Sequence, residues 1–307
     1  MTDPWVAPDT PSAPPPLPAP AAATGRGGAR VAMPFRPRVP VPLRPFTVPD
    51  ILDGGLRAVK LAPRIFIALA AVCVLPVQLV GAFLSRDALR EQNPLDAFAN
   101  GVDGTGPESN VFFIGFDAAT VAQLLGSVAL AFVAAGVAGV IIRWYLGLEA
   151  SPADAFRSAF RRPWTLLAAW LLVHLAELGF LILLFVPVIV PITWFAVVTP
   201  VVALESVGPI RSLGRSFRLC QRNFGKVLGT WMLVAVVDVL LSGALTAVGV
   251  LVADRSWGWI ANGALASAAA LITVPFVAAC ATLLYLDLRV RSEGLDLELA
   301  ANAQFGA

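Results

Sequence analysis

The stretch Ser151–Val186, SPADAFRSAFRRPWTLLAAWLLVHLAELGFLILLFV, decides the fold. It opens as a basic amphipathic helix, because Ser151 and Asp154 have capping-box spacing and Pro152 occupies a first-turn position that tolerates proline. Trp164–Val186 is almost wholly apolar and, at about 1.5 Å per residue, long enough to cross a hydrocarbon core of about 30 Å. The stretch therefore predicts an interfacial helix that leads directly into a membrane span.

The composition fits an integral membrane protein. Hydrophobic residues make up 58% of the 307 residues, far above the share in an ordinary soluble domain. The net charge of +2 gives no bulk attraction to nucleic acid, so no nucleic-acid partner is expected. A single histidine and three isolated cysteines without CxxC spacing (Cys73, Cys220 and Cys280) predict no cofactor, no metal site and no disulfide framework.

The same plan recurs before and after the opening stretch, so we expect an all-α, polytopic membrane bundle of about six transmembrane helices with three amphipathic interfacial helices. Leu56-Arg57 through Pro63 matches Phe156-Arg157 through Pro163 at an offset of 100, which indicates a threefold repeat of an amphipathic helix and a two-span hairpin. The amphipathic helices are expected at 50–62, from 151 onward and at 208–224. The spans are expected at about 64–84, 118–146, 164–186, between 187 and 204, at 226–253 and up to 286.

Three regions follow from this pattern. Residues 1–46 carry most of the 14 prolines found before position 50 and several arginines, so we expect a disordered, basic tail in which the PPPLP segment is a candidate site for a protein partner. Residues 47–292 form the six-span membrane domain, and residues 293–307 form a short polar tail.

The distribution of positive charge predicts the orientation. With the Pro-rich tail inside the cell, 19 of the 22 Lys and Arg residues lie on the cytoplasmic side, and only Arg86, Arg90 and Arg255 lie outside. An even number of spans then places both termini in the cytoplasm of a multi-pass protein of the plasma membrane. Residues 85–117, which carry six acidic side chains, become the main external connection.

Arginines of the amphipathic helices are candidates for contact with anionic lipid. On the 208–224 helix, four arginines fall on one side of the helical wheel and Ile210, Leu213 and Phe217 fall on another. A helix of this kind lies in the headgroup plane with its arginines directed to phosphates. The predicted lipid contacts are Arg157, Arg161, Arg162, Arg211, Arg215, Arg218 and Arg222.

Polar side chains inside the predicted spans are the second candidate site. His174 and Glu177 share a face of the third span, Asp238 of the fifth span lies at a similar depth, and Gln78 belongs to the first span. If the third and fifth spans are neighbours, these four side chains form one polar cluster. It would serve as a proton relay or a site for a polar substrate group, or it would only hydrogen-bond the helices together.

Three segments resemble a known family: PFTVPDILDGGLRAV at 45–59, PVVALESVGPIRSLGRSFRL at 200–219 and YLDLRVRSEGLDLELA at 285–300. They resemble actinobacterial stand-alone proteins related to the membrane domain of glycerophosphoryl diester phosphodiesterases, over roughly residues 45–300. The resemblance implies a six-helix bundle with interfacial helices. The named enzyme activity belongs to a separate barrel domain of about 250 residues, for which we expect no room here, and no catalytic residue carries over.

These observations predict a protein that is not an enzyme. We expect a non-catalytic membrane component that organises lipid or partner proteins through its basic interfacial helices. The alternative is a small transporter or permease-like carrier that uses the intramembrane His174, Glu177 and Asp238 cluster.

Overall fold

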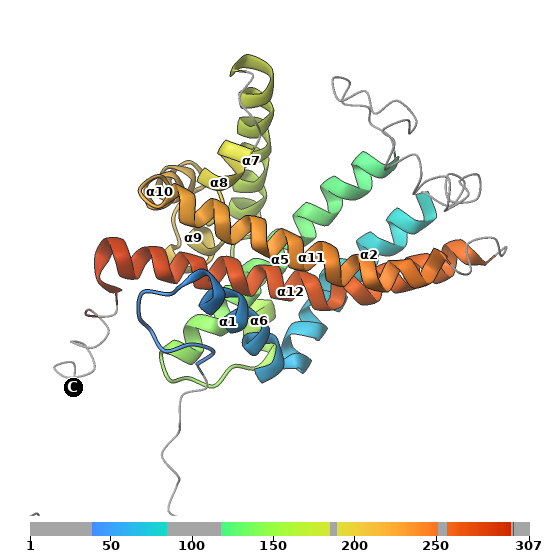
Figure 1. Cartoon of the computed structure of the whole chain (residues 1–307), viewed down its shortest axis with the longest axis horizontal. Helices are drawn as coiled ribbons and strands as arrows, with labels where there is room; N and C mark the ends of the chain where they lie inside the picture. Colours follow the sequence, from blue (N-terminus) through green and yellow to red (C-terminus); the bar gives the residue numbers. More distant parts are fainter. Residues whose placement is uncertain (1–38, 85–117, 185–188, 251–256, 296, 298–307) are drawn as a thin grey trace, which may run out of the picture. The chain divides into compact units, whose positions relative to one another are not determined.

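The computed structural model describes residues 39–84, 118–184, 189–250, 257–295 and 297, all within one compact unit, Arg36–Ala307. Every regular element among these residues is a helix, which confirms the predicted all-α membrane bundle (Figure 1). Most of the predicted Pro-rich tail, the main external connection and nearly all of the C-terminal tail lie outside the described residues.

Within the described ranges, five helices are long and apolar enough to cross a membrane. They begin and end close to five of the predicted spans, so the chain is a multi-pass membrane protein. These helices are α2 (Pro63–Leu84), α5 (Ala118–Tyr145), α7 (Pro163–Leu184), α11 (Phe224–Val250) and α12 (Gly258–Glu293).

The segment expected to form the fourth span is instead two short helices, α8 (Ile189–Trp194) and α9 (Val198–Glu205), joined by a turn. With 6 and 8 residues, they are about 9 and 12 Å long, and neither crosses the hydrocarbon core alone. Pro200 gives a physical reason, because it lacks the N–H that would continue a helix back to Ala196. The chain restarts its helix at Val198, which places Pro200 in a first turn where no donor is needed.

Three amphipathic helices precede α2, α7 and α11, as the sequence predicts: α1 (Val48–Leu61), α6 (Pro152–Ala159) and α10 (Pro209–Gln221). Capping boxes start the first two, with Thr47 and Asp50 at α1 and Ser151 and Asp154 at α6. At α6 the Asp154 amide donates to the Ser151 hydroxyl at 3.2 Å, and the Ser151 amide donates to the Asp154 carboxylate at 3.1 Å. Hydrogen bonds of this kind lower the pKa of both aspartates.

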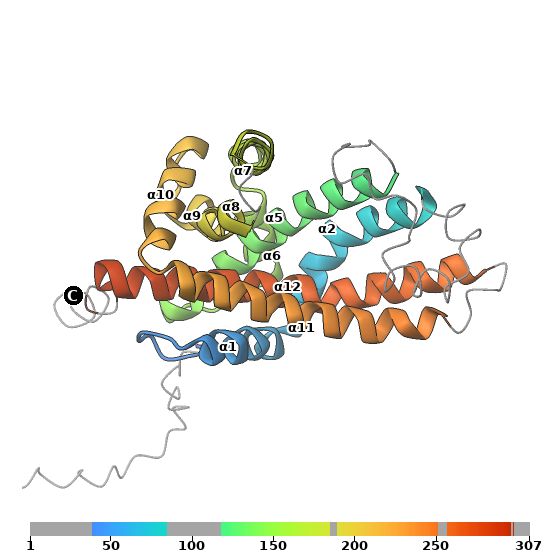
Figure 2. The ribbon, with the colours of Figure 1, turned by 45° about the horizontal axis from the view of Figure 1, so that its top comes forward.

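Each amphipathic helix packs against the last helix of the preceding repeat, in a cyclic order. The α6 helix packs on α5, α10 packs on α9, and α1 closes the cycle by packing on α12. Figure 2 shows α1 lying along the α11–α12 pair. The first and third repeats are complete hairpins, α2–α5 and α11–α12, whereas the second ends in the short α8 and α9.

The buried positions of the amphipathic helices show which residues of the three repeats are equivalent. The residues 4 and 8 positions after each N-cap are buried in all three amphipathic helices: Ile51 and Gly55, Ala155 and Ala159, Ser212 and Ser216. Counted from the caps Thr47 and Ser151, the offset between the first two repeats is 104, not the 100 obtained from their prolines. The two values differ by about one helical turn because α6 is shorter than α1, with 8 residues against 14, while its connection to the next helix, 160–162, is longer by about two residues.

All described Lys and Arg residues lie at one end of the bundle, where α2, α7 and α11 begin and α5 and α12 end. We call this the basic end. The α12 helix continues there past Leu286, its predicted limit, because Arg291 pairs with Asp287 one turn earlier. Gly294, with φ of 65°, ends the helix.

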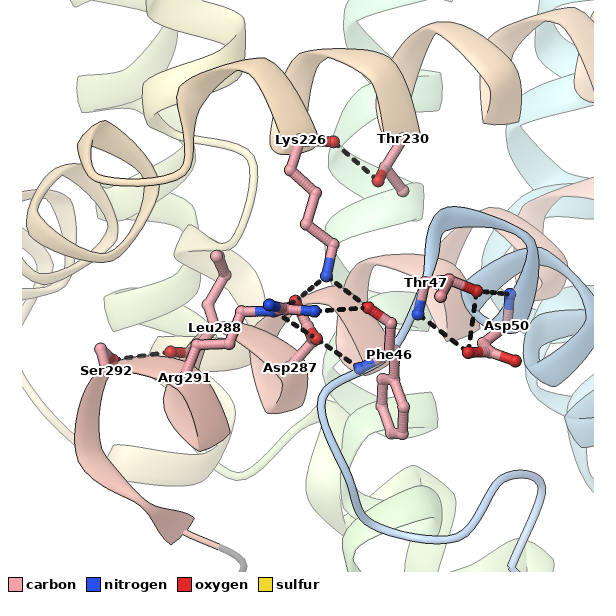
Figure 3. Close-up of polar contacts among 9 residues, drawn as sticks. All are labelled: Phe46, Thr47, Asp50, Lys226, Thr230, Asp287, Leu288, Arg291 and Ser292. Carbon is pink, nitrogen blue, oxygen red and sulfur yellow. Dashed lines mark hydrogen bonds and ion pairs between the residues drawn. The ribbon is translucent and has the colours of Figure 1, made fainter.

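Phe46 is clamped to the basic end by Asp287, a fully buried carboxylate (Figure 3). Asp287 accepts hydrogen bonds from the Phe46 amide at 2.7 Å, from Arg291 Nε at 3.0 Å, and from Lys226 Nζ. Lys226 and Arg291 also donate to the Phe46 carbonyl oxygen, at 2.7 and 2.8 Å. Val41 is buried as well, so the membrane unit includes residues 41–46, which the sequence had assigned to the tail.

Candidate functional site

A cavity of about 400 Å³, lined by apolar and several polar side chains, lies between α2, α5, α11 and α12. Gln78 and Asp238, two of the four residues predicted to form an intramembrane cluster, both line it. They lie 15 residues after the start of α2 and 14 after the start of α11, about 20 Å into the membrane region. Four further polar side chains line the cavity: Gln123, Ser127, Ser242 and Thr273.

Several polar groups of this cavity have no partner in the described part of the chain. Among the described residues, the side chains of Gln78, Asp238 and Thr273 make no hydrogen bond and no ion pair. Unsatisfied polar groups cost several kcal/mol each in a membrane interior. The cavity is therefore suited to hold water or a polar ligand that supplies the missing bonds.

His174 lines a second cavity, of about 170 Å³, enclosed by α5, α7, α9, α11 and α12. Its Nδ1 lies 3.0 Å from the Trp170 carbonyl oxygen, and the two rings are 4.5 Å apart. Trp170 Nε1 donates to Ser127, which lines both cavities. Trp231 also lines this second cavity, and its buried indole N–H has no partner among the described residues.

Glu177 lies one turn after His174 on α7 and lines neither of these two cavities. The α7 helix packs mainly against α5, α8, α9 and α10, and α8 contacts both α7 and α11. The third and fifth spans therefore do not bring Glu177 and Asp238 into one cavity. The structure unites Gln78 with Asp238, places His174 in the adjoining cavity, and leaves Glu177 apart.

Sequence reasoning missed Gln123, Ser127, Ser242 and Thr273. Gln123 and Ser127 are four residues apart on α5 and so share one face of that helix, which is a signal the sequence contains. Thr273 gives no such signal, because a single threonine in an apolar helix is common and only its neighbours show that it lines a cavity.

The α10 helix presents three sides rather than the two expected. Ser212, Ser216, Leu219 and Cys220 are buried against the protein. The arginines occupy a second side, and the third is apolar, with Ile210 77% exposed. A helix can lie at the membrane interface with this arrangement and still be anchored to the bundle, because the small buried side faces neighbouring helices.

Arg215 differs from the other arginines of α10, and its predicted role as a lipid contact needs correction. It forms ion pairs with Glu205 of α9, at 3.0 Å, and with Glu293 of α12. Tyr285 donates to the same Glu205 at 2.9 Å. Arg215 lies nearest the buried side of the helix wheel, so it joins helices instead of facing lipid.

The remaining predicted arginines divide into two groups. Arg157 is exposed and pairs with Asp154 at 3.4 Å, and Arg162 donates to the Ser206 carbonyl oxygen. The other four are exposed and have no ion-pair or hydrogen-bond partner within the described part of the chain: Arg161, Arg211, Arg218 and Arg222.

The three cysteines are free in the structure, and two of them are packing residues. Cys220 and Cys280 are buried, and burial raises the pKa of Cys220 to about 12, so its thiolate is scarce near neutral pH. Within the described ranges, no group of three or more His, Cys, Asp or Glu side chains is arranged to hold a metal ion.

No protein-family model, curated protein or solved structure matches this chain.

Proposed function

We propose that the protein is a non-catalytic component of the plasma membrane that binds anionic lipid headgroups with its basic amphipathic helices. The observation that carries this proposal is a set of four exposed arginines at the basic end that have no ion-pair or hydrogen-bond partner among the described residues: Arg161, Arg211, Arg218 and Arg222. Guanidinium groups bind phosphate with paired hydrogen bonds, and each basic side chain near an anionic surface contributes on the order of 1 kcal/mol.

The basic end faces the cytoplasm in this proposal, with both termini on that side. The clustering of every described Lys and Arg at this end supports the orientation, because positive residues are retained on the cytoplasmic side during insertion. In a cysteine-free background, a membrane-impermeant thiol reagent should label Thr105→Cys in intact cells and Arg30→Cys only after permeabilisation. The reverse pattern would overturn the orientation. The relation to phosphodiesterase membrane domains, and the protein partner of the Pro-rich tail, stay predictions.

Lipid binding is tested by the lipids that remain with the protein after purification. The full-length protein is extracted from its host membrane in mild detergent, and bound lipids are identified by mass spectrometry. Replacing the four arginines with Gln should remove the enrichment of anionic over zwitterionic lipid, whereas replacing them with Lys should preserve most of it because the charge is kept. Equal enrichment in wild-type protein and the Gln variant would refute the proposal.

A second candidate function, a small carrier for a polar solute, is supported by the cavity that Gln78 and Asp238 line. A carrier would depend on Asp238 rather than on the three-residue cluster expected from the sequence, because His174 and Glu177 do not line this cavity. This function is tested by reconstituting the protein in liposomes and measuring the uptake of polar solutes. Asp238→Asn should abolish the uptake, and Glu177→Gln should leave it unchanged. The opposite result would exclude a carrier of this design.

A further inference from the structure

We infer that the cavity between α2, α5, α11 and α12 is a binding site for a small organic cation, with its ammonium group at Asp238. Among the described residues that line this cavity, Asp238 is the only ionisable one, so none of them neutralises its charge. An isolated carboxylate is costly in a low-dielectric interior unless it is protonated or paired with a cation. The inference rests on the cavity proposed for the carrier, but binding does not require transport.

The neutral polar side chains suit an ammonium ligand. An ammonium group offers three N–H donors and no acceptor. Besides the carboxylate, the amide oxygens of Gln78 and Gln123 and the hydroxyl of Thr273 supply acceptors on three other helices. Gln78 and Thr273, like Asp238, have no hydrogen-bond partner among the described residues, so their acceptors are available to a ligand.

The size and remaining lining of the cavity favour an organic cation over a metal ion. The volume of about 400 Å³ far exceeds the space of about 10–15 Å³ that a single water molecule needs. Calcium sites surround one ion with about six to eight oxygen ligands, and magnesium is usually bound with the help of substrate phosphates, whereas the described residues that line this cavity include one carboxylate. The other lining residues are mostly Val, Leu and Ala, which suit the short alkyl part of an amine: Val74, Val77, Leu130, Ala266, Ala270 and Val274.

Binding is tested by isothermal titration of the full-length protein in detergent micelles with butylammonium chloride, and with 1-butanol as the neutral counterpart. We expect saturable binding of butylammonium but not of butanol, and at least tenfold weaker binding to Asp238→Asn. Glu177→Gln is the matched control, because it removes an intramembrane carboxylate that does not line the cavity. Its affinity should equal that of the wild-type protein.

A second variant blocks the site without touching the charge. Gly126 lines the cavity, and a Cβ added there meets nothing within 4 Å, so the phenyl ring of Gly126→Phe would occupy cavity space. We expect this variant to lose butylammonium binding while it retains Asp238. Equal binding by the wild-type protein and either variant, or no saturable binding by the wild-type protein, would overturn the inference. Binding without liposome uptake would refute only the carrier function.

Discussion

Asp287→Asn should be among the most destabilising conservative changes in the protein. Asn offers one acceptor oxygen in place of two and directs an NH₂ group toward Lys226 and Arg291, which both donate to the carboxylate. Removing one partner of a buried ion pair costs about 3–5 kcal/mol. The two cations are only 19% and 36% exposed, but both keep the Phe46 carbonyl oxygen as an acceptor. The lower limit therefore applies, about 3 kcal/mol, or a factor of about 100 in the folding equilibrium.

A thiol-reactive fluorogenic dye can follow this loss of stability during heating in detergent, because Cys220 and Cys280 are buried in the folded protein. For a domain of this size, about 3 kcal/mol corresponds to a melting temperature lower by roughly 6–12 °C. Asp53→Asn is the matched control, since its ion pair with Arg57 is exposed and contributes at most about 1 kcal/mol. If Asp287→Asn lowers the melting temperature no more than Asp53→Asn does, the hydrogen bonds and ion pairs of Asp287 do not stabilise the fold.

Gly139→Ala should destabilise the bundle by about 1–3 kcal/mol, because its Cβ would clash with the side chain of Ser158 of α6. Gly126→Ala, on the same helix with nothing within 4 Å, should melt like wild type; equal melting of both variants would contradict this packing. Hydrogen bonds to the N-cap residues hold the pKa of Asp50 and Asp154 below the ordinary 3.8, so their stabilisation is complete above about pH 4 and is lost as the pH falls through the lower folded-state values. The melting temperature should thus fall less between pH 7 and pH 3 when Asp50 and Asp154 are both replaced by Asn. An unchanged pH dependence would contradict a stabilising role of these two capping boxes. Glu177→Leu should be tolerated in the thermal assay, because Glu177 has no hydrogen-bond partner within the described residues; a large loss of stability would reveal a partner.

The local features could be predicted from the sequence because they depend on residues close together in the chain. The capping-box spacing of Ser151 and Asp154 gives the start of α6, and the long apolar runs give the approximate positions of α2, α5, α7, α11 and α12. The fourth span could not be predicted in the same way. Apolar composition gives no sign that the helix stops after Trp194 and restarts before Pro200.

Only part of the candidate site could be predicted from the sequence. Depth along each helix follows from counting residues, so Gln78 and Asp238 could be identified as intramembrane polar groups. Whether they share a cavity depends on which helices are neighbours, and this is decided by close packing between segments far apart in the chain. The same limit applies to Arg215, which the helical wheel groups with the lipid-facing arginines and which Glu205 and Glu293 hold inside the bundle.

The sequence by itself determined that this is a helical membrane protein, where its amphipathic helices and most of its spans begin, and which end carries the positive charge. Hydrophobic length, periodicity and capping are properties of short segments, and they do not depend on which other segments pack against them. Only the tertiary structure decided that Phe46 binds Asp287, 241 positions away. It also decided that Asp238 faces a shared cavity and that each amphipathic helix packs on the preceding repeat. These contacts depend on the complementary shapes and charges of several helices at once, and no single segment contains that information.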